Sequence, residues 1–226
     1  MNYTIGLDLG KARDYSAIIV VERLERDTGE RDTVYGESVS RLIDEYDVID
    51  IHRFPRGTTY PKIVDVVGRK LDEEPLKGRT MLRLDATGLG APVVDLFNDA
   101  YRNGRCGPYW PEGITITSGQ RGDRSNVPKV TLISRTQVLL QEGRLHFAAT
   151  HPLIQTLRQE LLDMRVKVSP TSGRDTYEAL TESIHDDLVT ALCLAVLWPH
   201  HYAECSRIDP TGTRHVRAES AWGRPG

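Results

Sequence analysis

The order of strand-like and helix-like segments is the feature that most constrains the fold of this chain. Two runs near the N-terminus, Tyr3–Leu9 (YTIGLDL) and Tyr15–Glu22 (YSAIIVVE), are short, apolar and rich in β-branched residues, which is typical of strands. A polar stretch with the turn signal Asp27-Thr28-Gly29 follows. Residues 46–54 (YDVIDIHRF) then partly alternate between apolar and polar. We therefore expect these three runs to form an antiparallel meander.

Downstream, helix-like and strand-like patterns alternate. Apolar spacing predicts helices over residues 60–71, 91–101, 127–141, 152–164 and 184–198, and strands over 80–85 and 113–117. Gly143 is a C-cap candidate for the third helix, and Thr150 is an N-cap candidate for the fourth. Strands first, then alternation, indicate an α/β domain with a mixed central β-sheet flanked by α-helices.

Composition narrows the class of protein further. A chain of 226 residues that is 39% hydrophobic can bury one sizeable core. We assign residues 1–203 to this domain and expect 204–226, which hold few large apolar side chains, to be a flexible C-terminal tail. The net charge of −3 lacks the strongly basic balance of a typical DNA-binding module. A nucleic-acid function would therefore depend on local residues and metal chemistry.

The cysteines argue against two kinds of site. There are three of them, an odd number, and no CxxC spacing occurs. This pattern disfavours a disulfide scaffold and a structural zinc site. Cys193 lies in an apolar stretch and is expected to be a core residue.

Four acidic residues stand where chemistry is expected. Asp8 lies between two leucines near the end of an apolar strand, where a carboxylate is costly unless it is paired, hydrogen-bonded or metal-bound. Asp85 ends a strand before a glycine-containing turn, the edge at which α/β sheets bind ligands. Asp186 and Asp187 open an apolar helix, and N-capping accounts for only one of them. Such oxygen ligands suit Mg²⁺, and two such ions can activate water against a phosphodiester.

Four segments in this order make the prediction specific: GLDLGKARDYSAIIVVE, LRLDATGLGAPVVDLF, VPKVTLISRTQVLLQEGRLHF and HDDLVTALCLAV. Over about Tyr3–Trp198 the sequence resembles the C-terminal nuclease domain of the large terminase subunit of tailed bacteriophages. The resemblance implies a ribonuclease H-like fold related to Holliday-junction resolvases. It also implies a metal-dependent DNA endonuclease that cuts concatemeric viral DNA during packaging, using Mg²⁺ or Mn²⁺, with two ions expected.

The resemblance also implies roles for individual residues. Asp8, Asp85 and Asp187 would be the catalytic metal ligands. Asp186 would be a neighbouring metal ligand and a substitute for Asp187. Asp14, just before the second strand, would contribute to the same metal site.

Basic residues complete the expected site. Lys129 opens a helix where the resemblance implies a lysine near phosphate. Arg121 and Arg124 lie in the polar loop 118–126 and are candidates for contacts to a DNA backbone. The resemblance further implies double-stranded DNA, a terminase ATPase domain or small subunit, and a portal as partners, in the cytoplasm of the infected bacterial host. No GxxxxGK[ST] phosphate loop is present, so the resemblance implies either an excised nuclease domain or a separately encoded nuclease.

Three alternatives stay open at this point. A junction resolvase-like, structure-specific nuclease would use the same acids. An actin- or sugar-kinase-like ATP-binding domain is a weaker alternative, because GLDLG and DATGLG superficially resemble the phosphate turns of that group. In a non-catalytic assembly module, the acids would be purely structural.

Overall fold

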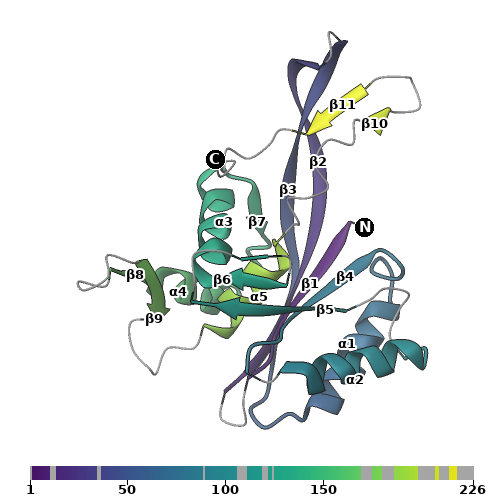
Figure 1. Ribbon diagram of the computed structural model, residues 1–226, viewed down its shortest axis with the longest axis vertical. Coiled ribbons are helices and arrows are strands. Elements are labelled where there is room, and N and C mark those ends of the chain that lie inside the picture. Colours follow the sequence, from purple (N-terminus) through teal and green to yellow (C-terminus); the bar gives the residue numbers. More distant parts are fainter. Residues whose placement is uncertain are drawn as a thin grey trace.

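The computed structural model describes residues 2–10, 14–34, 37–88, 90–105, 111–118, 122–123, 125–168, 175–179, 186–197, 207–208 and 214–217. Within this part of the chain, nine strands form one mixed sheet in the order β10-β11-β3-β2-β1-β4-β5-β6, with β7 also pairing with β3 (Figure 1). The strands of this sheet are β1 (Tyr3–Asp8), β2 (Ser16–Val34), β3 (Glu37–Phe54), β4 (Thr80–Asp85), β5 (Glu112–Thr117), β6 (Asn126–Pro128), β7 (Leu145–Phe147), β10 (Arg207–Ile208) and β11 (Arg214–Arg217). A separate antiparallel pair joins β8 (Met164–Val168) to β9 (Asp175–Ala179).

The expected meander is present, but its second and third strands are much longer than predicted. β1 pairs with β2 and β2 with β3, both antiparallel. The polar stretch around Asp27-Thr28-Gly29 is not the turn between them. Gly29 has a φ of 76°, and the strand register shifts between Asp27 and Arg31, so these residues form an irregularity inside the long strand. The prediction of a turn at this place was therefore wrong.

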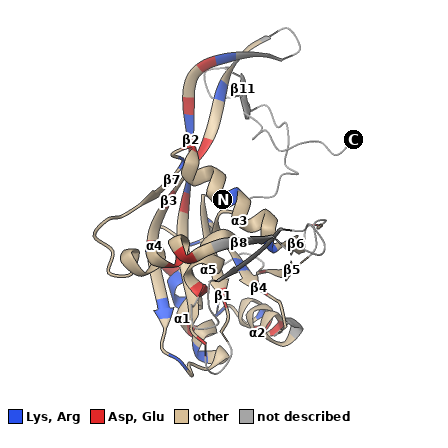
Figure 2. Cartoon of the chain, turned by 90° about the vertical axis from the view of Figure 1, so that its left-hand side faces the viewer, with Lys and Arg blue, Asp and Glu red and all other residues tan. Residues whose placement is uncertain are grey.

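Charged side chains explain how a polar sequence extends this hairpin beyond the core. Figure 2 shows basic and acidic residues following one another along the outer parts of β2 and β3. Arg26 Nε lies 2.6 Å from Glu45 Oε1, and Arg41 Nη1 lies 2.7 Å from Glu30 Oε2. Cross-strand pairs of opposite charge stabilise neighbouring strands, and these ion pairs favour the pairing of the outer parts of β2 and β3. β11 lies parallel to β3 along this outer part.

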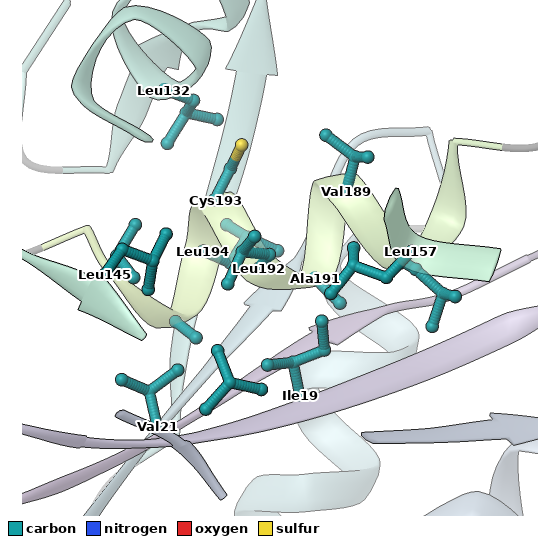
Figure 3. Close-up of a cluster of buried hydrophobic side chains, with 14 of the residues drawn as sticks. Ile19, Val21, Leu132, Leu145, Leu157, Val189, Ala191, Leu192, Cys193 and Leu194 are labelled. Atoms are coloured by element: carbon teal, nitrogen blue, oxygen red, sulfur yellow. The ribbon is translucent and has the colours of Figure 1, made fainter. Parts of the chain in front are cut away.

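The helices cover both faces of the sheet. They are α1 (Tyr60–Asp72), α2 (Gly90–Arg102), α3 (Lys129–Gln141), α4 (Ile154–Asp163) and α5 (Asp187–Ala195). One buried cluster joins α1 and α2 to one face through residues such as Ile63, Phe97 and Leu84. The other joins α3, α4 and α5 to the opposite face, where Leu157, Ala191 and Leu192 lie above Ile19 (Figure 3). The expected α/β architecture, a mixed sheet flanked by helices, is thus confirmed.

The ends of the expected helices differ in detail from the structure. Val127 belongs to β6, and α3 begins at Lys129. Gly143 follows α3 with a φ of 64°, as a C-cap glycine should. The prediction that Thr150 caps the fourth helix was wrong, because α4 begins at Ile154 and no side chain caps it.

Two strands fall in the segment that was expected to be a flexible tail. They are β10 and β11, while the other residues of 204–226 lie outside the described part of the chain. The proposed division at residue 203 remains a prediction. No helix in the described ranges is both long and apolar enough to span a membrane.

Cys193 is a core residue, as predicted. It is 2% exposed in α5, and Thr136 Oγ1 lies 3.2 Å from its Sγ. Burial raises the pKa of the Cys193 thiol to about 11. The thiolate is the reactive form of cysteine, so a buried thiol with this pKa is inert at pH 8.

Iodoacetamide at pH 8 is therefore expected to leave Cys193 unmodified in the folded protein and to alkylate it in urea. Mass spectrometry of the peptide that contains Cys193 measures both, and the urea sample is the control for peptide recovery. Equal alkylation with and without urea would show that α5 is not packed as described.

Candidate functional site

A row of side chains crosses one edge of the sheet where β1, β3 and β4 end. Asp8 pairs with Ala17 of β2, and Ala17 pairs with Arg53 of β3. Leu7 pairs with Leu84, so the next residues, Asp8 and Asp85, end neighbouring parallel strands. Paired residues share a face of the sheet and adjacent strands lie about 4.8 Å apart. Asp85, Asp8, Ala17 and Arg53 therefore follow one another across four strands.

Helix α5 packs directly over this row. A Cβ at Gly6 would lie 1.9 Å from Ala191 O and 2.6 Å from Ala195 N, so only glycine lets the helix approach β1 this closely. Asp8 is two residues beyond Gly6 and shares its face. The N-terminus of α5, with Asp186 and Asp187, is thereby brought to the edge that carries Asp8 and Asp85.

Asp8 is the electrostatic centre of the cluster. Desolvation by the surrounding protein raises the pKa of Asp8 well above its ordinary value, and the carboxylates of Asp85, Asp186 and Asp187 raise this pKa further. The Lys129 ammonium acts in the opposite direction. Three acids that lie far from Asp8 in the sequence thus act on one carboxyl group. The sequence prediction that the four acids converge is consistent with this arrangement.

Asp85 is oriented by the turn that follows its strand. Its Oδ1 accepts a hydrogen bond from the Thr87 backbone N–H at 2.7 Å. Desolvation raises the pKa of Asp85, and hydrogen bonds from Thr87 lower it. The Lys129 ammonium lowers this pKa further, whereas the Asp186 carboxylate raises it. Asp85 and Asp8 therefore share two charged neighbours, Lys129 and Asp186.

Asp186 lies at the N-cap position of α5 but does not cap the helix with its side chain. Its Oδ2 instead lies 2.8 Å from Lys129 Nζ, and about a third of each side chain is exposed. Lys129, for which the resemblance implies a position near phosphate, thus lies at the carboxylate cluster. Its contact with DNA stays a prediction.

Asp187 is more deeply held than its neighbour. It is 5% exposed, and its Oδ2 accepts a hydrogen bond from Arg53 Nε at 2.8 Å. The Arg53 guanidinium also forms an ion pair with Glu160 of α4. It further lies 4.9 Å from the centre of the Tyr15 ring, a cation–π distance. Arg53 therefore joins the sheet, α4 and the start of α5.

Glu160 caps α5 from outside the helix. Its Oε2 accepts hydrogen bonds from the backbone N–H groups of Leu188 at 3.0 Å and Val189 at 3.3 Å. These are donors of the first turn, which no residue of the helix itself can satisfy through the backbone. Desolvation raises the pKa of Glu160 to about 7, with a further increase from Asp187 and a decrease from Arg53 and the Val189 N–H.

Sequence reasoning missed Arg53 and Glu160, although each leaves a signal. Arg53 follows Ile51 by two residues and so occupies an inward position of an alternating strand. Glu160 follows the buried Leu157 by three residues and so lies on the apolar face of its helix. A charged residue at a core position requires a partner. Arg53 and Glu160 could therefore have been identified from the pattern as charged residues at core positions.

The donor set fits a hard divalent cation in its chemistry. Asp8, Asp85, Asp186 and Asp187 offer carboxylate oxygens, and their mutual repulsion would be relieved by positive charge. Among the described residues, however, no three His, Cys, Asp or Glu side chains are already grouped as a metal site. Asp186 points to Lys129 and Asp187 to Arg53. Metal binding would therefore require some of these side chains to turn.

Three further candidates stay predictions. Asp14 is exposed in the loop between β1 and β2. Arg121 and Arg124 lie outside the described residues.

Comparison with known proteins relates this fold to that of a phage large terminase nuclease. No protein-family model matches the chain, and no curated protein matches it. The structure of the large terminase nuclease from thermophilic phage G20c is similar, with 23% identity, a TM-score of 0.52, and coverage of 85% of this chain and 80% of that one.

Two further structures are more distant. The large terminase nuclease domain of bacteriophage SPP1, with bound Mn, has 14% identity, a TM-score of 0.47 and coverage of 86% of this chain and 85% of that one. The P22 large terminase nuclease domain has 12% identity, a TM-score of 0.49 and coverage of 85% and 78%. The phage G20c structure confirms the resemblance found in the sequence at the level of the fold. The chain has an α/β fold of the ribonuclease H-like class, similar over most of its length to that of a large terminase nuclease.

Proposed function

We propose that this chain is a divalent-metal-dependent DNA endonuclease of the large terminase type, which cuts concatemeric viral DNA during genome packaging. The observation that carries the proposal is the convergence of Asp8, Asp85, Asp186 and Asp187 at one sheet edge. The fold similarity to the phage G20c nuclease supports it. A purely structural role does not account for a desolvated carboxyl group whose charged neighbours include three more acids.

The residues of the chain have distinct parts in this proposal. Asp8 and Asp85, at adjacent strand ends, and Asp187 at the start of α5 would hold Mg²⁺ or Mn²⁺, with Asp186 as the neighbouring ligand. Two such ions, when bound, supply an activated water and stabilise the leaving oxygen of the phosphodiester. Arg53 orients Asp187, and the Thr87 N–H orients Asp85. Asp14 is retained as a more peripheral candidate ligand.

Lys129 gives the site its positive charge toward DNA. In the described structure its ammonium group contacts Asp186 at 2.8 Å. If Asp186 turned toward a bound cation, Lys129 would become available to a phosphate oxygen of double-stranded DNA. Arg121 and Arg124 are proposed to extend this contact along the backbone. The family resemblance of the sequence is the ground for the proposed partners, which are the terminase ATPase domain or small subunit and the portal. It is also the ground for the proposed location, the cytoplasm of the host.

Cleavage of plasmid DNA is expected to require Mg²⁺ or Mn²⁺ and to fall to background in excess EDTA. The reason is the all-carboxylate donor set, which offers hard oxygens and no thiolate. Mn²⁺ is expected to support cleavage at least as well, because Mg²⁺ demands near-ideal octahedral geometry and the carboxylates of the described residues are not already arranged for it.

Agarose gels of supercoiled plasmid, with metal added back after chelation, measure this requirement. The Asp8→Asn variant, purified in parallel, controls for a contaminating nuclease. Undiminished cutting by the wild-type protein in EDTA would contradict the proposed chemistry.

A further inference from the structure

The first turn of α5 is capped in an unusual way. The carboxylate at its N-cap position, Asp186, makes no capping bond and contacts Lys129 instead. An aspartate at this position ordinarily accepts a hydrogen bond from the backbone N–H two or three residues on. Here the N–H groups of Leu188 and Val189 donate to Glu160, which belongs to another helix. The Asp186 carboxylate, which would ordinarily cap this helix, is therefore not used as a cap and lies with the other carboxylates of the site.

The same glutamate also determines how Arg53 is shared. Glu160 Oε1 forms the ion pair with Arg53, while Arg53 Nε contacts Asp187 Oδ2 at 2.8 Å. One guanidinium is therefore divided between two nearly buried carboxylates, Glu160 at 6% and Asp187 at 5% exposure. Without Glu160, the full positive charge of Arg53 would fall on Asp187 and reduce its attraction for a cation.

We propose that Glu160 is a positioning residue of the nuclease site: by capping α5 and sharing Arg53, it keeps the carboxylates of Asp186 and Asp187 available to divalent metal. The inference rests on the proposed function. In this proposal Glu160 acts through Arg53 and the backbone of α5 and is not itself a metal ligand. Removal of residues that orient metal ligands typically weakens metal affinity or activity about 10- to 100-fold.

The test is calorimetric titration of metal-free protein with Mn²⁺, alongside plasmid cleavage. Glu160→Ala is expected to weaken Mn²⁺ binding about 10- to 100-fold and to slow cleavage by a similar factor. Glu160→Gln keeps an oxygen that can accept from Leu188 and Val189 but loses the charge that holds Arg53. It is expected to fold like the wild type and to bind Mn²⁺ about threefold to tenfold more weakly, since only one of the two effects is lost.

Glu142→Ala is the matched control. Glu142 also pairs with an arginine, Arg144 at 2.8 Å, but lies just after α3. This variant is expected to bind Mn²⁺ like the wild type. A role of Glu160 in stability alone would lower the melting temperature and leave Mn²⁺ affinity unchanged at a temperature where the protein is folded.

The outcomes separate this inference from the proposed function. A folded Glu160→Ala variant that binds Mn²⁺ with wild-type affinity would overturn the inference. If Glu160→Ala does not fold, wild-type Mn²⁺ affinity in Glu160→Gln would overturn it. In both cases the wild-type protein still binds metal and cuts DNA. If the wild-type protein neither binds Mn²⁺ nor cuts DNA, the proposed function itself fails.

Discussion

Asp8→Asn is expected to reduce DNA cleavage by about 1000-fold or more and, at the same time, to raise the melting temperature of the metal-free protein. The loss of activity follows from the central position of Asp8 in the carboxylate cluster. A metal-held transition state is stabilised by several kcal/mol, and each 1.4 kcal/mol corresponds to about a tenfold change in rate. Asparagine keeps the size of the side chain and removes only its negative charge.

The gain in stability follows from the direction of the pKa shift. The folded protein raises the pKa of Asp8 above its unfolded value, so it binds this proton more tightly than the unfolded chain does. The resulting stability is present at acidic pH below the unfolded pKa and is lost as pH rises through the folded pKa. At higher pH the ionised Asp8 destabilises the metal-free protein. An asparagine at this position cannot ionise, so the variant escapes this cost.

Thermal unfolding in EDTA and plasmid cleavage in Mn²⁺, on the same preparations, measure both effects. Asp72→Asn is the control, because Asp72 is exposed at the end of α1, which packs on the opposite face of the sheet. It should change neither property. An inactive Asp8→Asn variant that is also less stable in EDTA would indicate a structural role for Asp8 rather than a metal site.

Asp187→Asn is expected to nearly eliminate cleavage, whereas Asp186→Asn should retain much of it. Asp187 is fixed by Arg53 and lies in the buried first turn of α5, so its carboxylate is the more precisely oriented of the two. Asp186 is a third exposed and contacts Lys129, a contact that asparagine can partly preserve. Because Glu160 accepts from the first-turn N–H groups, neither variant removes the cap of α5.

Cleavage rates at saturating Mn²⁺, with circular dichroism to verify folding, compare the two variants. The reverse result, an inactive Asp186→Asn beside an active Asp187→Asn, would make Asp186 the principal ligand and leave Asp187 as the partner that anchors Arg53. Wild-type rates in both variants would remove α5 from the metal site and with it the main support for the proposed function.

The local pattern of the sequence was enough for most of the elements and for the acids. Periodicity is a property of neighbouring residues, and it predicted the strand at 80–85 and the helix at 60–71 to within one residue. The same local reasoning singled out Asp8 and Asp85, because a carboxylate at the end of an apolar strand conflicts with its surroundings. It failed at Asp27-Thr28-Gly29, where a turn motif is accommodated as an irregularity inside a long hairpin stabilised by cross-strand ion pairs.

The sequence alone therefore determined the α/β class and singled out the acids that we propose as metal ligands, since both leave a mark among residues close in the chain. Only the tertiary structure decided how the acids are held. Arg53 reaches Glu160 across 107 positions and Asp187 across 134, and Glu160 caps a helix that begins 27 residues later. Such contacts depend on strand register and on helix packing over Gly6. No periodicity encodes them, because they arise when segments distant in sequence are brought together by burial of the common core.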